Sequence, residues 1–129
     1  MEYQFSFPFG KEKDAEKILR YLATHVPPAL SAIKIFGPGN KNYLSFPSEG
    51  YVVGITFPWK SKYLQIVTKL DEDVSRMGFK KYLSKDLFTK SRLLHEMYPN
   101  LKLFLKFKKN IDPQEVFVSD MYKRILKRN

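Results

Sequence analysis

The 129-residue sequence contains no cysteine, and this absence excludes disulfide bonds, cysteine-ligated zinc and a thiol nucleophile. Its two histidines, His25 and His95, lack the spacing of a metal-binding pair. The six glycines form no G-x-G-x-x-G loop, no Walker loop and no G-x-S-x-G elbow. A self-sufficient active site of these common classes therefore cannot be assembled from the sequence, and no metal site is expected.

Long apolar runs and acidic residues are also scarce. No stretch approaches the roughly 20 residues that span a bilayer, and Met1 leads directly into a strand-like pattern instead of a signal peptide. Lys and Arg total 23 against 13 acidic residues, which gives a net charge of +10. This charge suits an anionic partner such as nucleic acid, acidic lipid or a phosphorylated substrate, or simply a solvated surface. We expect a cytoplasmic protein, with or without peripheral contact at the inner face of the membrane.

What is present predicts one folded domain, because hydrophobic residues make up 43% of the sequence and aromatic residues 16%. Apolar residues alternate as in strands over residues 3–9, 31–36, 51–57 and 79–84. They recur at helical spacing over residues 11–26 and 61–77, with Ser61 as a candidate N-cap and Gly78 as the terminating glycine. Residues 42–50 contain Pro47 and are predicted to form a loop or an edge strand.

The order of these elements predicts an α+β fold of the ferredoxin-like βαββαβ type, a four-stranded antiparallel sheet with both helices on one face. From Asp86 the chain predicts helical pieces interrupted at Pro99 and Pro113, and a last helix capped by Ser119-Asp120. Their apolar residues require burial against the domain or in a groove on a partner: Leu87, Leu94, Met97, Leu101, Leu103, Phe104 and Phe107. We predict a core over residues 1–86 and a helical extension over 87–129 packed on it, a single domain overall.

The sheet face away from the helices is the candidate functional surface. If Tyr3, Phe5, Phe7, Val53, Ile55 and Phe57 face the helices, the other face presents Gln4, Ser6, Val52, Gly54 and Thr56, with Lys34 added from the second strand. Such a polar, small-residue face suits a ligand floor, and suits a solvated surface or an interface about equally well.

Lys34 and Lys85 are each expected among apolar neighbours at a strand, where a lysine needs a carboxylate, a phosphate or a substrate oxygen. From the residues alone, the favoured interpretation of Lys85 is an ion pair with Asp86 or a helix C-terminus. The corresponding interpretation of Tyr82 is a half-buried sheet aromatic, and that of Gln4 is a solvated polar residue.

Several short motifs occur in a distinctive order. They are Tyr3-Gln-Phe, Ile33-Lys-Ile-Phe-Gly-Pro, Leu44-Ser-Phe-Pro, Tyr82-Leu-Ser-Lys-Asp86, Met97-Tyr-Pro and Val116-Phe-Val-Ser-Asp-Met121. This combination resembles the C-terminal substrate domain of FAD-linked oxidases of the vanillyl-alcohol-oxidase type, the aldonolactone and decaprenylphosphoryl-ribose oxidases in particular. The resemblance covers essentially the whole chain.

The resemblance implies oxidation of a sugar or sugar-lactone hydroxyl, with FAD as the cofactor. By position, Lys85 looks like the family's catalytic lysine, and Gln4, Lys34, Val52 and Gly54 look like substrate-binding positions. Tyr82 looks like a cofactor contact. The decaprenylphosphoryl-ribose enzymes carry asparagine at the position of Val52 and cysteine at that of Gly54, so this pocket departs from theirs.

The same resemblance implies that FAD is bound mainly by a domain that this sequence does not contain. The implied partners are therefore an FAD-binding domain or subunit and a sugar or polyprenyl-phosphate sugar substrate, and the chain is expected to be inactive by itself. It would be a fragment or a separately encoded half. The alternative is a basic ferredoxin-like RNA-binding or protein-interaction module. Nucleic acid is disfavoured because residues 51–57 lack the RNA-binding motif expected in that strand.

Overall fold

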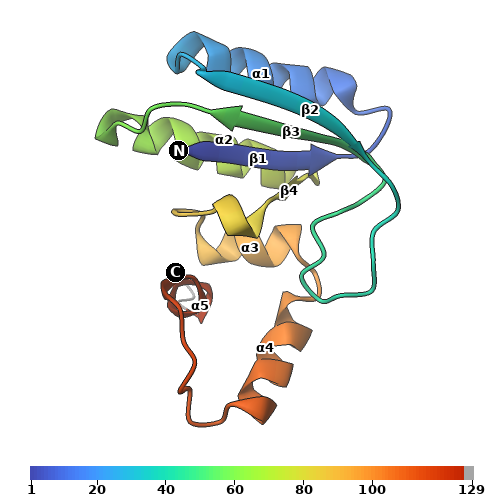
Figure 1. Ribbon diagram of the computed structural model, residues 1–129, viewed down its shortest axis with the longest axis vertical. Coiled ribbons are helices and arrows are strands. Elements are labelled where there is room, and N and C mark those ends of the chain that lie inside the picture. The colour runs from blue at the N-terminus through green and yellow to red at the C-terminus, as the bar shows by residue number, and fades with distance from the viewer. Residues whose placement is uncertain (127–129) are drawn as a thin grey trace.

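The computed structural model describes residues 1–126 and contains a four-stranded antiparallel sheet with the strand order β2-β3-β1-β4 (Figure 1). The strands are β1 (Glu2–Phe7), β2 (Leu30–Phe36), β3 (Gly50–Thr56) and β4 (Lys80–Lys81). The helices are α1 (Glu12–His25), α2 (Leu64–Arg76), α3 (Ser91–Met97), α4 (Leu101–Ile111) and α5 (Asp120–Leu126), with 3-10 turns η1 (Ser61–Tyr63) and η2 (Leu83–Lys85). The α+β class is confirmed, and the first six main elements follow the βαββαβ order.

The hydrophobic core lies between one face of the sheet and the two helices α1 and α2. Tyr3 pairs with Ile55 and Phe5 pairs with Val53, so these side chains share one face. All four are buried together with apolar residues of α1 and α2. Because burying a large apolar side chain contributes roughly 1.5–3 kcal/mol, this layer supplies much of the stabilisation that holds the helices on the sheet.

A glycine ends α2, as the sequence predicts. Gly78 has φ +72°, a left-handed conformation that costs other residues energy. Its N–H donates to the Ser75 carbonyl and the Phe79 N–H donates to the Val74 carbonyl, each at 2.9 Å, which is the Schellman pattern. The prediction for the other end is wrong: the chain enters α2 through η1, and Ser61 makes no side-chain capping bond there.

The fourth strand is shorter than predicted. Only Lys80 and Lys81 pair with β1, at Ser6 and Phe5. The Tyr82 N–H still donates to the Gln4 carbonyl at 2.8 Å, but the next N–H groups close the turn η2 instead of extending the ladder. Lys85 therefore lies in the turn η2 at the end of the strand, as predicted, but its side chain is 42% exposed and is not enclosed by apolar neighbours.

The helices after residue 86 extend the core and then leave it. Leu93, Leu94 and Met97 of α3 are buried in the main core, as is Ile125 of α5. The Ser119 hydroxyl accepts a hydrogen bond from the Tyr122 N–H at 3.1 Å, which confirms the predicted cap. Helix α4 lies away from the sheet (Figure 1).

Burial against the domain accounts for only some of the apolar residues after Asp86, and the alternative of a groove on a partner stays a prediction for the others. Leu94, Met97 and Leu101 are buried, whereas Leu87, Leu103 and Phe107 are about half exposed. The physical reason is that α4 contacts the body of the protein along one side, while its opposite side faces outward.

Candidate functional site

The sheet face opposite the helices carries a shallow pocket of about 90 Å³. Gln4 and Ala32 each lie beside Gly54 in the strand register, and Lys34 lies beside Val52, so β1, β3 and β2 all contribute to one surface. The lining residues are Glu2, Gln4, Leu30, Ala32, Lys34, Val52, Gly54 and Thr56. The fold thus brings Gln4, Lys34, Val52 and Gly54 together.

The pocket is hollow at Gly54 because glycine has no side chain. A Cβ atom at this position would meet the Glu2 carboxylate at 3.4 Å, an ordinary contact distance. A small residue could therefore be accommodated, but it would fill the floor of the pocket. Val52 lines the same floor, although only 1% of its surface is accessible. Its contribution is shape, since it offers no polar atom.

The other half of this sheet face is covered by the segment between β2 and β3. The Lys80 ammonium donates to the Ser45 carbonyl at 3.2 Å, and Lys80 lies opposite Ser6 in the register. Phe46 is buried against Phe36, with ring centroids 6.0 Å apart. The predicted loop over residues 42–50 therefore acts as a cover. Only the half of the face at the pocket stays open.

Lys85 lies next to the pocket and is connected to it through Glu2. The Lys85 ammonium is 2.9 Å from the Glu2 carboxylate, and 42% of the lysine side chain is exposed. The sequence-based pairing with Asp86 or a helix C-terminus is therefore wrong, because β1 brings Glu2 beside the turn η2. The hydrogen bond and negative charge of Glu2 raise the pKa of Lys85, with a smaller contribution from Tyr82. Lys85 is a protonated donor at neutral pH.

Tyr82 is half-buried and packs on Phe46, with the ring centroids 4.7 Å apart. It borders the covered half of the face and is not among the residues that line the pocket. The Lys85 N–H nevertheless donates to the Tyr82 carbonyl at 3.1 Å, so the two residues belong to the same turn. Tyr82 therefore stands between the pocket margin and the covering segment.

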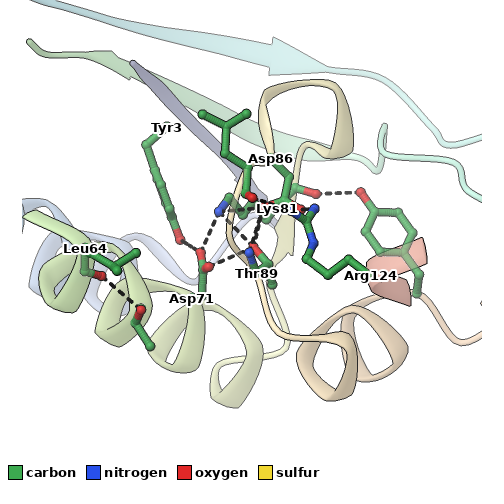
Figure 2. Close-up of polar contacts among 10 residues, drawn as sticks. Tyr3, Leu64, Asp71, Lys81, Asp86, Thr89 and Arg124 are labelled. Carbon is green, nitrogen blue, oxygen red and sulfur yellow. Dashed lines mark hydrogen bonds and ion pairs between the residues drawn. The ribbon is translucent and has the colours of Figure 1, made fainter. Parts of the chain in front are cut away.

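Sequence reasoning missed a buried polar cluster around Lys81 (Figure 2). The Lys81 ammonium is fully buried, 2.8 Å from the Asp71 carboxylate and 3.0 Å from that of Asp86. The Tyr3 hydroxyl donates to Asp71 at 2.8 Å, and the Thr89 hydroxyl lies within 2.7 Å of both carboxylates. A signal was present: Lys81 has the same strand parity as core-facing Phe79, so alternation directs it inward.

This Lys81 cluster connects the tail to the core beneath the candidate site. Arg124 of α5 pairs with the outer oxygen of Asp86 and donates to the Leu87 carbonyl. Burial acts to raise the pKa of Asp86, but the charge of Lys81, the bonds from Thr89 and the charge of Arg124 outweigh it and hold that pKa below its usual value. Two cations and two carboxylates thus fix the backbone next to Lys85.

A larger apolar hollow lies elsewhere, beside α4 and α5. It measures about 430 Å³. Its lining residues are Leu44, Phe104, Lys108, Phe117, Val118, Ser119, Met121, Tyr122 and Ile125. Phe117 is 81% exposed at its edge, and Leu103, Phe107 and Ile111 are exposed along α4. This surface has few polar groups, so it is better suited to packing than to chemistry.

Neither a metal-ligand cluster nor a membrane-spanning helix is found within residues 1–126. There, no three His, Asp or Glu side chains gather as metal ligands would. Over the same range, every helix is too short or too polar to cross a bilayer.

Comparisons with known proteins point in one direction. Residues 55–125 match the sequence profile of the family described as D-arabinono-1,4-lactone oxidase. The chain is 35% identical over 127 residues to the decaprenylphosphoryl-beta-D-ribose oxidase of Mycolicibacterium smegmatis. The aligned region covers 97% of this chain and 27% of that protein. It is also 33% identical over 116 residues to a Streptomyces coelicolor protein described as an uncharacterized protein in the mprA 5′ region. That alignment covers 85% of this chain and 32% of the S. coelicolor protein. The chain thus spans about a quarter to a third of the length of these relatives.

Proposed function

Because the chain belongs to the D-arabinono-1,4-lactone oxidase family, we propose that it is the substrate-binding part of an FAD-dependent oxidoreductase that oxidises a sugar or sugar-lactone hydroxyl. The observation that carries the proposal is the pocket on the open sheet face. Gln4, Lys34, Val52 and Gly54, which are far apart in the sequence, line one hollow, and Lys85 reaches its edge through Glu2. Donors and acceptors spaced around a small apolar floor suit a polyhydroxylated ring.

Each residue has a definite part in this proposal. The Gln4 amide can donate to and accept from sugar hydroxyls, and the exposed Lys34 ammonium suits a hydroxyl or phosphate oxygen. Gly54 leaves room for the ring. Lys85 acts as the catalytic residue by donating a hydrogen bond that orients and polarises the reacting hydroxyl, because its raised pKa keeps it protonated. The proton that the hydroxyl loses would pass to the Glu2 carboxylate, which lines the pocket. Glu2 positions Lys85.

The described residues do not fit FAD as a whole. They include no glycine-rich pyrophosphate loop, and a pocket of about 90 Å³ is well below the roughly 300 Å³ at the lower end of ligand sites. We therefore assign to this chain one wall of the active site, with FAD bound mainly by another domain or subunit. When bound, FAD would supply the redox chemistry. Tyr82, at the margin of the pocket, is the residue proposed to border the cofactor.

The apolar surface of α4 is the proposed contact for that flavin-binding part. Leu103, Phe107 and Ile111 recur every four residues and face outward, next to the hollow at Phe117. The sugar substrate of the complex could itself carry a lipid. The name of the M. smegmatis relative indicates a lipid-linked sugar for that protein. In that case the exposed lysines of α4 would also suit acidic headgroups at a membrane surface.

The pocket can be tested without the flavin-binding part. We would titrate the ¹⁵N-labelled chain with D-arabinono-1,4-lactone and with ribose 5-phosphate, and follow the amide signals. The proposal expects saturable shifts at Gln4, Lys34, Gly54 and Lys85, and their loss in Gly54→Val, which fills the floor. Gly37→Val is the matched control because Gly37 has open space around it. Shifts that avoid the sheet face, or that survive Gly54→Val unchanged, contradict the proposal.

Activity provides the second test. In a flavin-loaded complex, Lys85→Ala should lower kcat by roughly a hundredfold or more, the range in which a positioned donor acts. The purified chain should carry no flavin absorbance. If the purified chain alone held FAD tightly, the proposal that another domain or subunit binds most of the cofactor would be refuted.

The alternative of an RNA-binding module has less support. Such modules stack bases on aromatic side chains of the open sheet face. Here the pocket is lined by no aromatic residue, and the aromatic rings of Phe36, Phe46 and Tyr82 pack on one another in the covered half. A salt-sensitive mobility shift with single-stranded RNA, mapped to the pocket, would favour the alternative.

A further inference from the structure

The turn η2 carries Lys85, and its position depends on what holds its two ends. At its start, the Tyr82 N–H donates to the Gln4 carbonyl at 2.8 Å, which joins the turn to β1. Within it, the N–H groups of Lys85 and Asp86 donate to the carbonyls three residues earlier, each at 3.1 Å. Its far end lies beyond the residues of β4 that pair with β1, so the hold on that end comes from the residues that follow.

Asp86 holds the far end of the turn. Its side chain is fully buried, whereas 42% of the side chain of Lys85 is exposed, so one points into the protein and its neighbour out of it. One carboxylate oxygen of Asp86 accepts a hydrogen bond from the Thr89 N–H at 3.1 Å and lies 3.0 Å from the Lys81 ammonium. The other oxygen pairs with Arg124 of α5 (Figure 2). Both oxygens are therefore occupied, the second by a helix that is remote in sequence.

Arg124 makes two bonds with different effects. Its charge completes the balance of the Lys81 cluster, because Asp71 and Asp86 both lie beside one ammonium group. Its second bond goes to the Leu87 carbonyl, an uncharged acceptor, and adds nothing to that balance. This bond instead fixes the backbone just beyond the turn. The planar guanidinium suits the double role, because its rigid fork of N–H groups reaches two acceptors at once.

Helix α5 gives Arg124 a fixed base. The Ser91 hydroxyl of α3 donates to the Ile125 carbonyl at 2.6 Å, and Ile125 is buried in the core. Arg124 itself is mostly buried, with 26% of its side chain exposed. A chain of contacts therefore runs from the core through α5 to the segment that follows Lys85.

We propose that Arg124 is a positioning residue for Lys85. By holding Asp86 and Leu87, it fixes the end of η2 so that the Lys85 ammonium stays at the edge of the pocket, 2.9 Å from the Glu2 carboxylate. Arg124 does not line the pocket and lies 39 positions after Lys85, so it acts through the residues that it holds. The effect on catalysis rests on the proposed function, whereas the placement of Lys85 does not.

The placement of Lys85 can be measured without substrate or flavin. Lysines labelled with ¹³C at Cε would be titrated by NMR, and Lys85→Arg would identify the signal of Lys85. In the wild type, Glu2 raises the pKa of Lys85. In Arg124→Lys, which keeps the charge next to Asp86 but not the rigid fork, this pKa should fall toward the ordinary value of about 10.4. The variant should remain folded, because the buried charges stay balanced.

Lys123→Gln is the matched control. Lys123 is the neighbour of Arg124 on α5, its side chain is 61% exposed, and it faces Asp120 of the same helix at 3.9 Å. Arg124→Gln removes the charge and should lower both the pKa of Lys85 and the melting temperature, whereas Lys123→Gln should change neither. If the pKa of Lys85 keeps its wild-type value in folded Arg124→Lys, Arg124 only stabilises the fold and the proposal is overturned.

Turnover separates this proposal from the proposed function. In a flavin-loaded complex, Arg124→Lys should lower kcat by about tenfold with little change in KM, because a slightly misplaced donor acts less well. In the Lys85→Ala background the same substitution should have no further effect, since both changes act through one group. Additive losses would overturn the positioning role. A lowered pKa of Lys85 with unchanged turnover would instead contradict the catalytic role of Lys85 and leave its positioning by Arg124 intact.

Discussion

Replacing Lys81 with methionine should destabilise the protein more than any other lysine substitution considered. The methionine keeps much of the side-chain length but removes the charge that faces Asp71 and Asp86, both of which are buried. Within residues 1–126, Lys81 is the cation paired with Asp71, while Asp86 keeps Arg124. Removing one partner from a buried ion pair costs about 3–5 kcal/mol, because a charge is left without compensation.

The expected cost of Lys81→Met is large relative to the total free energy of unfolding. Domains of this size are stable by about 5–15 kcal/mol, so Lys81→Met should remove a fifth or more of the free energy of unfolding. At about 3–5 °C per kcal/mol, the melting temperature should fall by roughly 10–25 °C. Thermal and urea unfolding followed by circular dichroism at pH 7 would measure it.

The pH dependence gives a sharper criterion. In the wild type, the lowered pKa of Asp86 means that its contribution to stability is present above the unfolded pKa of about 3.9 and is lost as the pH falls through the folded value. In Lys81→Met, burial of Asp86 is opposed by fewer charges, so acidification should neutralise the Asp86 carboxylate and relieve the variant. The stability difference between the two proteins should therefore narrow from pH 7 to pH 4.5.

The control is Lys17→Met, which removes an exposed lysine paired with Asp14 on the surface of α1. Exposed pairs contribute about 0–1 kcal/mol, so this variant should unfold close to the wild type. If Lys81→Met costs less than about 1 kcal/mol, or if its deficit does not change with pH, the buried charges are not compensated in the way described.

Further substitutions test the turn, the Tyr3 hydrogen bond and the Lys85 pair. Gly78→Ala should cost about 1–2 kcal/mol in urea unfolding because φ is +72° there, whereas Gly37→Ala, which has open space and no such angle, should change stability by less than about 0.5 kcal/mol. Tyr3→Phe should cost about 1.5–3 kcal/mol, since it removes a buried donor from a carboxylate. Burial and the charge of Asp71 raise the pKa of Tyr3, and burial raises that of Tyr98, so in an absorbance titration both phenols should ionise only as the protein unfolds in alkali. Lys85→Ala should leave the urea midpoint at pH 7 nearly unchanged; a large shift would show that the residue is structural. Because its pKa is raised, any stability from the Glu2 pair should be present below about pH 10.4 and disappear as the pH rises through the folded value.

The local sequence pattern was sufficient to predict much of the fold and the four residues that share the open sheet face. Alternation in residues 3–7 and 51–57 predicts which side chains face the helices, because successive residues of a strand point to opposite sides. The same rule assigns Gln4, Lys34, Val52 and Gly54 to the open face, and the register confirms that they share it. Gly78 as a helix terminator also follows from local chemistry, since few other residues tolerate its backbone angle.

Only the tertiary structure decided which charges meet and which surfaces stay open. Lys85 pairs with Glu2, which is 83 positions away in the sequence, and not with its neighbour Asp86. Asp86 turns inward instead, to Lys81 and Arg124. Alternation describes the direction of a side chain, but an ion pair depends on the distance between atoms that are remote in sequence. The covering of half the sheet face has the same origin, since burial is set by what other segments of the chain pack against a strand.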